Sequence, residues 1–157
     1  MTPRPPPPPR QHQQPATRPS ASAFAVAYAA GAVAFLALDA LWLVTMAERL
    51  YRPAIGHLMQ AGFDVRAAAA FYVIYLAGVT GFAVLPAAGV RAAAVRGAAF
   101  GLVAYATYDL TNQATLRGWP WSVTLVDLAW GAFVTAASAA AAHAALRRFV
   151  PPRAVSA

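Results

Sequence analysis

Three of the five acidic residues of this chain lie inside long apolar stretches: Asp39, Asp109 and Asp127. A carboxylate within a membrane costs about 2.5–3.5 kcal/mol on insertion scales, so such residues face a protein interior and need a partner or a proton. Carboxyl groups in that setting can hold a cation, relay a proton or serve as a general acid or base. These three residues are therefore the first candidates for chemistry.

Aromatic and polar side chains recur close to each acid. Trp42 lies three residues after Asp39, and Trp130 lies three residues after Asp127, so each tryptophan shares a helical face with its acid. Arg117 is the nearest cation that could offset one of the carboxylates. The predicted ligand or proton site comprises Asp39, Trp42, Tyr72, Tyr75, Tyr105, Tyr108, Asp109, Asn112, Arg117, Asp127 and Trp130.

Three hypotheses of function fit this set. The first is a protein that binds or transports a small ligand, a cation or a proton through an outward-facing intramembrane pocket. The second is a membrane-embedded enzyme that acts on a lipid or isoprenoid, with an Asp as acid or base. The third is a structural or accessory subunit whose polar side chains only join helices. We predict no metal site, because no ligand spacing supports one, and the residues identify no cofactor and no catalytic role.

The composition defines the class of protein. Of the 157 residues, 60% are hydrophobic and 11% are charged, against roughly 45–50% and about 25% in a typical soluble domain. A chain of this size cannot bury so much apolar surface in a water-soluble core. The net charge of +7 comes from arginines in tails and loops, without the interleaved aromatics of a nucleic-acid surface. A soluble enzyme and a nucleic-acid-binding domain are both excluded.

Four apolar segments follow a proline- and arginine-rich tail at 1–21, which we expect to be disordered. They run over about 22–46, 67–86, 92–116 and 123–146. Each is long enough to cross the roughly 30 Å hydrocarbon core at 1.5 Å per residue. The sequence thus predicts an all-α, four-helix transmembrane bundle over 22–149 and a short C-terminal tail at 150–157. The third span is the least apolar, because it contains Arg96 and Asp109.

The arginines predict the orientation. Four spans place both termini on one side, and that side carries eight of the 12 arginines. Because arginine-rich segments stay in the cytoplasm, we expect both termini to be cytoplasmic. The predicted protein is a multi-pass protein of the bacterial inner (plasma) membrane, with the lipid bilayer as its partner.

The topology places the three acids in one layer of the outer half of the membrane. Asp39, Asp109 and Asp127 each lie roughly 8–10 Å below the outer end of their span. Three carboxyl groups at one depth would titrate as a cluster. The loop at 117–121 is placed to cover this layer as a lid.

Two further patterns concern packing. In the first loop, Pro53 suits the first turn of a helix, and Tyr51, Ile55 and Leu58 share one face, which predicts a short interfacial helix at 53–60. Gly97 and Gly101 form a G-x-x-x-G pair, which permits close approach of helices. The pair favours packing within the bundle, with a homodimer as the alternative.

Three motifs together resemble a known family: DALWL at 39–43, AYATYDLTNQATLRGWP at 104–120 and DLAWG at 127–131. They are similar to those of small bacterial membrane proteins grouped as domain of unknown function 2177, over about 24–149. The resemblance implies a four-span inner-membrane protein. It carries no established activity, so it assigns no catalytic residue.

Overall fold

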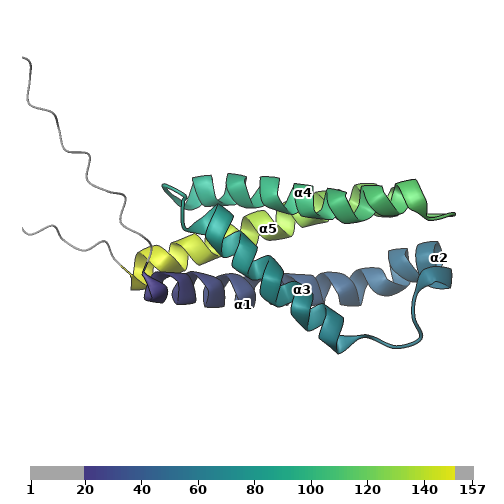
Figure 1. The fold of residues 1–157 in the computed structure, drawn as a ribbon, viewed down its shortest axis with the longest axis horizontal. Helices are drawn as coiled ribbons and strands as arrows, with labels where there is room; N and C mark the ends of the chain where they lie inside the picture. The colour runs from purple at the N-terminus through teal and green to yellow at the C-terminus, as the bar shows by residue number, and fades with distance from the viewer. Residues whose placement is uncertain (1–19, 151–157) are drawn as a thin grey trace, which may run out of the picture.

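The computed structural model describes residues 20–150, which are helical apart from short turns and contain no strand (Figure 1). The long helices are α1 (Ala21–Met46), α3 (Val65–Gly78), α4 (Val90–Thr115) and α5 (Trp121–Phe149). The short elements are η1 (Ala47–Tyr51), α2 (Arg52–Ile55), η2 (Gly56–Leu58) and η3 (Val79–Val84). The four predicted spans coincide with the long helices, and the predicted tails lie almost wholly outside the described residues.

Polar caps fix two helix starts. The Ser20 hydroxyl accepts a hydrogen bond from the amide of Ala23 at the start of α1. The Asp64 carboxylate accepts from the amides of Arg66 and Ala67, at 2.9 and 3.1 Å, at the start of α3. Both side chains satisfy amides that lack an intrahelical partner. Asp64 is therefore an acid with a local structural role.

The first span continues beyond its apolar stretch. α1 passes through the wide π-helical turn η1 into α2 and η2, so the helix runs from Ala21 to Leu58. Pro53 explains the wide turn, because a proline lacks the amide hydrogen and its ring collides with the carbonyl four residues earlier. The amide of Arg52 instead bonds to the carbonyl of Ala47, five residues back. The predicted helix at 53–60 is thus a continuation of the first span that ends at Leu58.

The second span also contains a π-helical turn before a proline. The π-helical turn η3 precedes Pro86, and the amide of Leu85 bonds to the carbonyl of Thr80, five residues back. Because Pro86 has no amide hydrogen, the carbonyl of Phe82 lacks its usual helical donor. The Arg96 guanidinium of α4 donates to that oxygen from two nitrogens, at 3.0 and 2.9 Å. Arg96 therefore ties the third span to the second.

Small residues bring α4 and α5 together. A Cβ atom on Gly97 would lie 2.7 Å from the carbonyl oxygen of Thr135, and one on Gly101 would collide with the carbonyl oxygen of Gly131. Only glycine permits this spacing. The predicted pair of Gly97 and Gly101 therefore packs α4 against α5 within the bundle.

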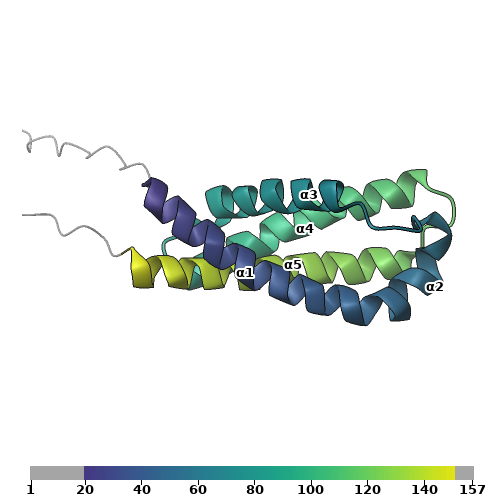
Figure 2. The ribbon, with the colours of Figure 1, turned by 90° about the horizontal axis from the view of Figure 1, so that it is seen from below.

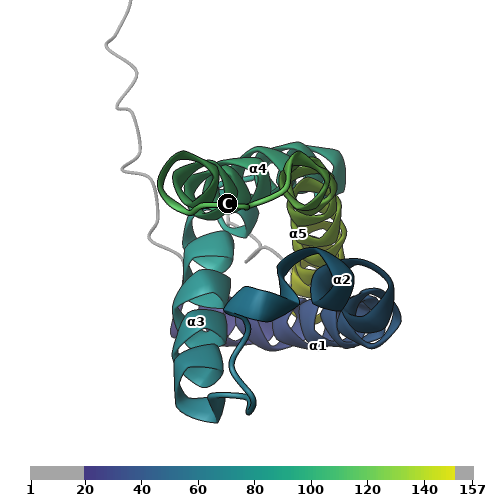
Figure 3. The ribbon, with the colours of Figure 1, turned by 90° about the vertical axis from the view of Figure 1, so that its right-hand side faces the viewer.

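The helices form one elongated bundle. Viewed along its long axis, α1, α3, α4 and α5 are arranged around the centre, and α2 lies across one end (Figure 3). The start of α1 and the end of α5 lie together at the opposite end (Figure 2). This arrangement is what an even number of spans produces.

The helices suit a membrane. Three stretches among the described residues are long and apolar enough to cross one: Ala21–Leu58, Val65–Val84 and Trp121–Phe149. α4 falls short, because arginine, Asp109 and several amides and hydroxyls dilute its apolar residues. Large apolar side chains are exposed on several helices, including Val44 at 78%, Ile74 at 72% and Phe82 at 69%. Such a surface matches lipid better than water.

Candidate functional site

Asp39 is held inside the bundle by two aromatic donors. Its side chain projects from α1 and is buried. The hydroxyl of Tyr72 from α3 donates to one carboxylate oxygen at 2.6 Å. The indole nitrogen of Trp130 from α5 donates to the other at 3.3 Å. Three spans therefore converge on this carboxylate.

Asp127 is held in the same way from the first loop. The hydroxyl of Tyr51, at the end of η1, donates to its Oδ1 at 2.6 Å. Tyr51 in turn accepts a hydrogen bond from the indole nitrogen of Trp42 at 2.8 Å. Because an indole N–H can only donate, the hydroxyl proton of Tyr51 is directed to the carboxylate. The chain of donors runs from Trp42 through Tyr51 to Asp127.

The two tryptophans join these networks. The rings of Trp42 and Trp130 stack with their centroids 4.2 Å apart and their planes at 7°. Trp42 donates toward Asp127 through Tyr51, and Trp130 donates to Asp39. Asp39, Asp127 and the aromatic residues therefore form one connected unit across α1 and α5.

This unit lines a cavity of about 520 Å³, called here the acidic cavity. Both carboxylates line it, and most of its other lining residues are aromatic: Trp42, Tyr51, Phe63, Tyr72, Tyr105, Tyr108, Trp119 and Trp130. Ile55 and Met59 from the first loop also border it, at the end where α2 lies. The predicted lid contributes Trp119, which is buried and donates through its indole nitrogen to Thr124 at 3.1 Å.

The structure does not place Arg117 beside a carboxylate. α4 ends at Thr115, and Gly118 has a φ of 77°, which turns the chain back toward α5. Arg117 lies exposed in that turn. Within residues 20–150 the one salt bridge joins Arg52 and Glu48, so neither acid of the cavity has a cationic partner there.

Asp109 lies outside the cavity. It is fully buried, and neither of its carboxyl oxygens has a hydrogen-bond partner. It continues the four-residue spacing of Gly97 and Gly101, the stripe that packs against α5. Asn112, which is half-buried near the end of α4, does not line the acidic cavity either. Of the three predicted acids, Asp39 and Asp127 line the acidic cavity and Asp109 does not.

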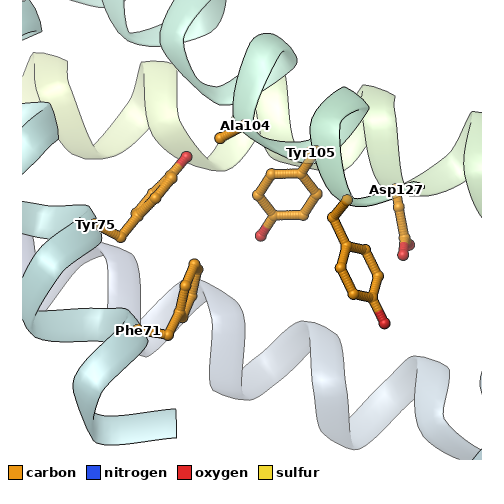
Figure 4. Close-up of a pocket in the computed structure, with 6 residues that line it drawn as sticks. Phe71, Tyr75, Ala104, Tyr105 and Asp127 are labelled. Atoms are coloured by element: carbon orange, nitrogen blue, oxygen red, sulfur yellow. The ribbon is translucent and has the colours of Figure 1, made fainter. Parts of the chain in front are cut away.

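A second cavity of about 370 Å³, called here the side cavity, adjoins the first. Its lining residues are Phe71, Tyr75, Ala104, Tyr105, Tyr108 and Asp127 (Figure 4). Tyr75 and Thr135 share a hydrogen bond of 2.6 Å between their hydroxyls. The ring of Tyr105 fits against α5 because residue 131 is glycine, whose added Cβ would overlap that ring.

Sequence reasoning missed Tyr51 as a cavity residue. The sequence pattern places Tyr51 on the apolar face of an interfacial helix, whereas the π-helical turn before Pro53 brings its hydroxyl to Asp127. The proline was the available signal. Within the described range, no group of three or more His, Asp or Glu side chains is placed to hold a metal ion.

Comparison with known proteins identifies the family. The family described as predicted membrane protein (DUF2177) matches residues 24–144, in agreement with the motif resemblance. No curated protein and no solved structure matches the chain. The match includes α3 and α4 in full, most of α1 and α5, and both acids of the cavity. The chain therefore belongs to the DUF2177 family of predicted membrane proteins.

Proposed function

We propose that this chain is a multi-pass inner-membrane protein that binds a small organic cation in the acidic cavity. The observation that carries the proposal is the pair Asp39 and Asp127, which line one cavity without a cationic side chain beside them among the described residues. Buried carboxylates are costly unless a positive charge or a proton accompanies them. A cationic ligand supplies that charge.

The character of the walls supports an organic cation. The faces of Trp and Tyr rings attract ammonium groups by about 0.5–2 kcal/mol each, and aromatic cages recognise quaternary ammonium groups. Tyr105 and Tyr108 line the cavity, and the hydroxyl of Tyr105 forms no hydrogen bond with another described side chain or backbone group. At about 520 Å³, the cavity is far larger than a bare metal ion needs.

The proposed orientation puts the acidic cavity in the outer half of the membrane. The cavity lies toward the end of the bundle that carries α2, opposite the start of α1 and the end of α5. With both termini cytoplasmic, as the arginines predict, the end of the bundle that carries α2 faces the periplasm. Ligand then reaches the carboxylates from the periplasmic half of the bilayer.

Binding of tetramethylammonium tests the proposal. Trp42, Trp119 and Trp130 line the acidic cavity, so the purified protein in maltoside micelles should report the probe through a saturable change in tryptophan fluorescence. We expect Asp39→Asn and Asp127→Asn each to weaken binding at least tenfold, because each removes a charge that faces the cation. Asp64→Asn is the matched control, because Asp64 only caps α3 and lines neither cavity.

Two results would overturn the proposal. One is no saturable response in the wild-type protein. The other is equal affinity in the wild type and both Asn variants, which would locate the probe elsewhere. Retained binding in Asp64→Asn would show that the weaker binding of the other two variants is not a general effect of removing a negative charge.

A further inference from the structure

The acidic cavity and the side cavity lie next to each other. Tyr105, Tyr108 and Asp127 line both of them. A group bound beside Asp127 therefore has two directions in which to extend: along the acidic cavity toward Asp39, or into the side cavity toward Phe71 and Ala104.

The side cavity opens on the flank of the bundle. Phe71 of α3 and Tyr108 of α4 border it, and they are 44% and 58% exposed. The second span lies against α4 at η3, and the start of α3 lies away from α4, across α1 (Figure 1). The side cavity thus lies between two diverging helices, on a surface that faces hydrocarbon when the bundle is in a bilayer.

The walls of the side cavity are mostly apolar, and its one carboxylate is that of Asp127. Phe71 and Ala104 present only hydrocarbon, and the hydroxyl of Tyr75 is bonded to Thr135. The close-up shows Phe71 and Tyr75 on one side and Asp127 at the opposite end (Figure 4). A molecule that fills both cavities would be charged at one end and apolar at the other.

We infer that the ligand is an amphipathic cation, whose ammonium group lies between Asp39 and Asp127 and whose single hydrocarbon chain lies in the side cavity and leaves between α3 and α4. The inference rests on the proposed function and adds the class of ligand and its route. The ligand enters sideways from the bilayer, so its chain need not cross the aqueous phase. Ring faces and carboxylates then select the cationic end.

Two probes with the same charged group separate the two proposals. Tetramethylammonium has no chain, and dodecyltrimethylammonium adds one. Ala104→Phe fills the side cavity, and Ala99→Phe on the same helix is the matched control, because Ala99 borders a different groove with Phe82 and Arg96. Both probes are titrated in maltoside micelles by tryptophan fluorescence, with empty micelles as the blank.

We expect the wild type to bind dodecyltrimethylammonium at least tenfold more tightly than tetramethylammonium. Ala104→Phe should abolish that advantage and leave tetramethylammonium binding within twofold of the wild type. Ala99→Phe should behave as the wild type with both probes. Unchanged tetramethylammonium binding also shows that Ala104→Phe has folded. If Ala104→Phe does not fold, Ala104→Leu repeats the test with a smaller side chain.

If both Ala104 variants still bind dodecyltrimethylammonium more tightly than tetramethylammonium, by the same ratio as the wild type, the inference is overturned and the proposed function stands. The same holds if the wild type binds both probes equally. If the wild type binds neither probe, the proposed function itself fails. The three outcomes are distinct.

Discussion

The hydroxyl of Tyr51 donates to Oδ1 of Asp127 at 2.6 Å, although the two residues lie 76 positions apart. The bond joins the end of the first span to the start of the fourth span, and both residues line the acidic cavity. Tyr51 also accepts from Trp42, whose ring stacks on that of Trp130. This hydroxyl therefore connects η1, next to α2, to the carboxylate of Asp127.

Tyr51→Phe should destabilise the protein by about 1–3 kcal/mol, because it leaves both the Trp42 indole and the Asp127 carboxylate without a partner in a part-buried site. Thermal unfolding in maltoside micelles measures the loss. Tyr28→Phe is the control, since the Tyr28 hydroxyl makes only a 3.5 Å contact with the Val73 carbonyl in an exposed position. Equal stability of the two variants would show that the Tyr51 bond contributes nothing.

Gly101→Ala should prevent α4 and α5 from packing as they do. The added methyl group would overlap the Gly131 carbonyl and the Thr135 side chain, and overpacking of a close interface costs about 1–3 kcal/mol or more. Gly81→Ala is the control, because a Cβ there meets no atom within 4 Å. Loss of the folded, monodisperse peak in size-exclusion chromatography for Gly101→Ala, with Gly81→Ala unaffected, is the expected result. Normal behaviour of Gly101→Ala would contradict the packing argument.

Three of the long helices could be predicted from the sequence because each is an apolar stretch long enough to cross the hydrocarbon core, and α4 could be predicted from its length between polar turns. The carboxylates at 39 and 127 could be expected inside for the same reason. The position of Tyr51 could not, because it depends on one extra residue in a helical turn, which changes the direction of every later side chain. Pro53 marks where such a turn is needed, but the residue count of the turn is fixed only by packing.

Asp109 and Arg117 show a second limit of sequence reasoning. Asp109 lies four residues after Tyr105 and shares its helical face, but that face also carries the glycines that pack on α5. Its side chain is therefore enclosed between helices instead of lining the cavity. Arg117 is near the acids in the sequence, yet the turn at Gly118 leaves it exposed. Depth in a membrane can be counted from the sequence, whereas the direction of a side chain depends on the neighbouring helix.

Reporter fusions test the proposed orientation. A fusion after Val150 should be active only as a cytoplasmic reporter, because eight arginines belong to that side. Fusions after Arg66 and Gly118 should be active only as periplasmic reporters. The helix of lowest hydropathy, α4, is tested by the pair Gly89 and Gly118, which should report opposite sides. A periplasmic signal after Val150 would reverse the side from which ligand reaches the acidic cavity.

Replacing Asp109 should stabilise the protein. Both oxygens of this fully buried carboxyl group lack a hydrogen-bond partner, and an unsatisfied buried polar group costs about 1–3 kcal/mol. Asp109→Val removes the polar atoms and should raise the midpoint of thermal unfolding, whereas the nearly isosteric Asp109→Asn keeps two buried polar atoms and should change it less. Neither variant should alter tetramethylammonium affinity, since Asp109 lines neither cavity. A lower midpoint in Asp109→Val than in the wild type would contradict this prediction and would mean that the carboxyl group has a stabilising partner in the working protein.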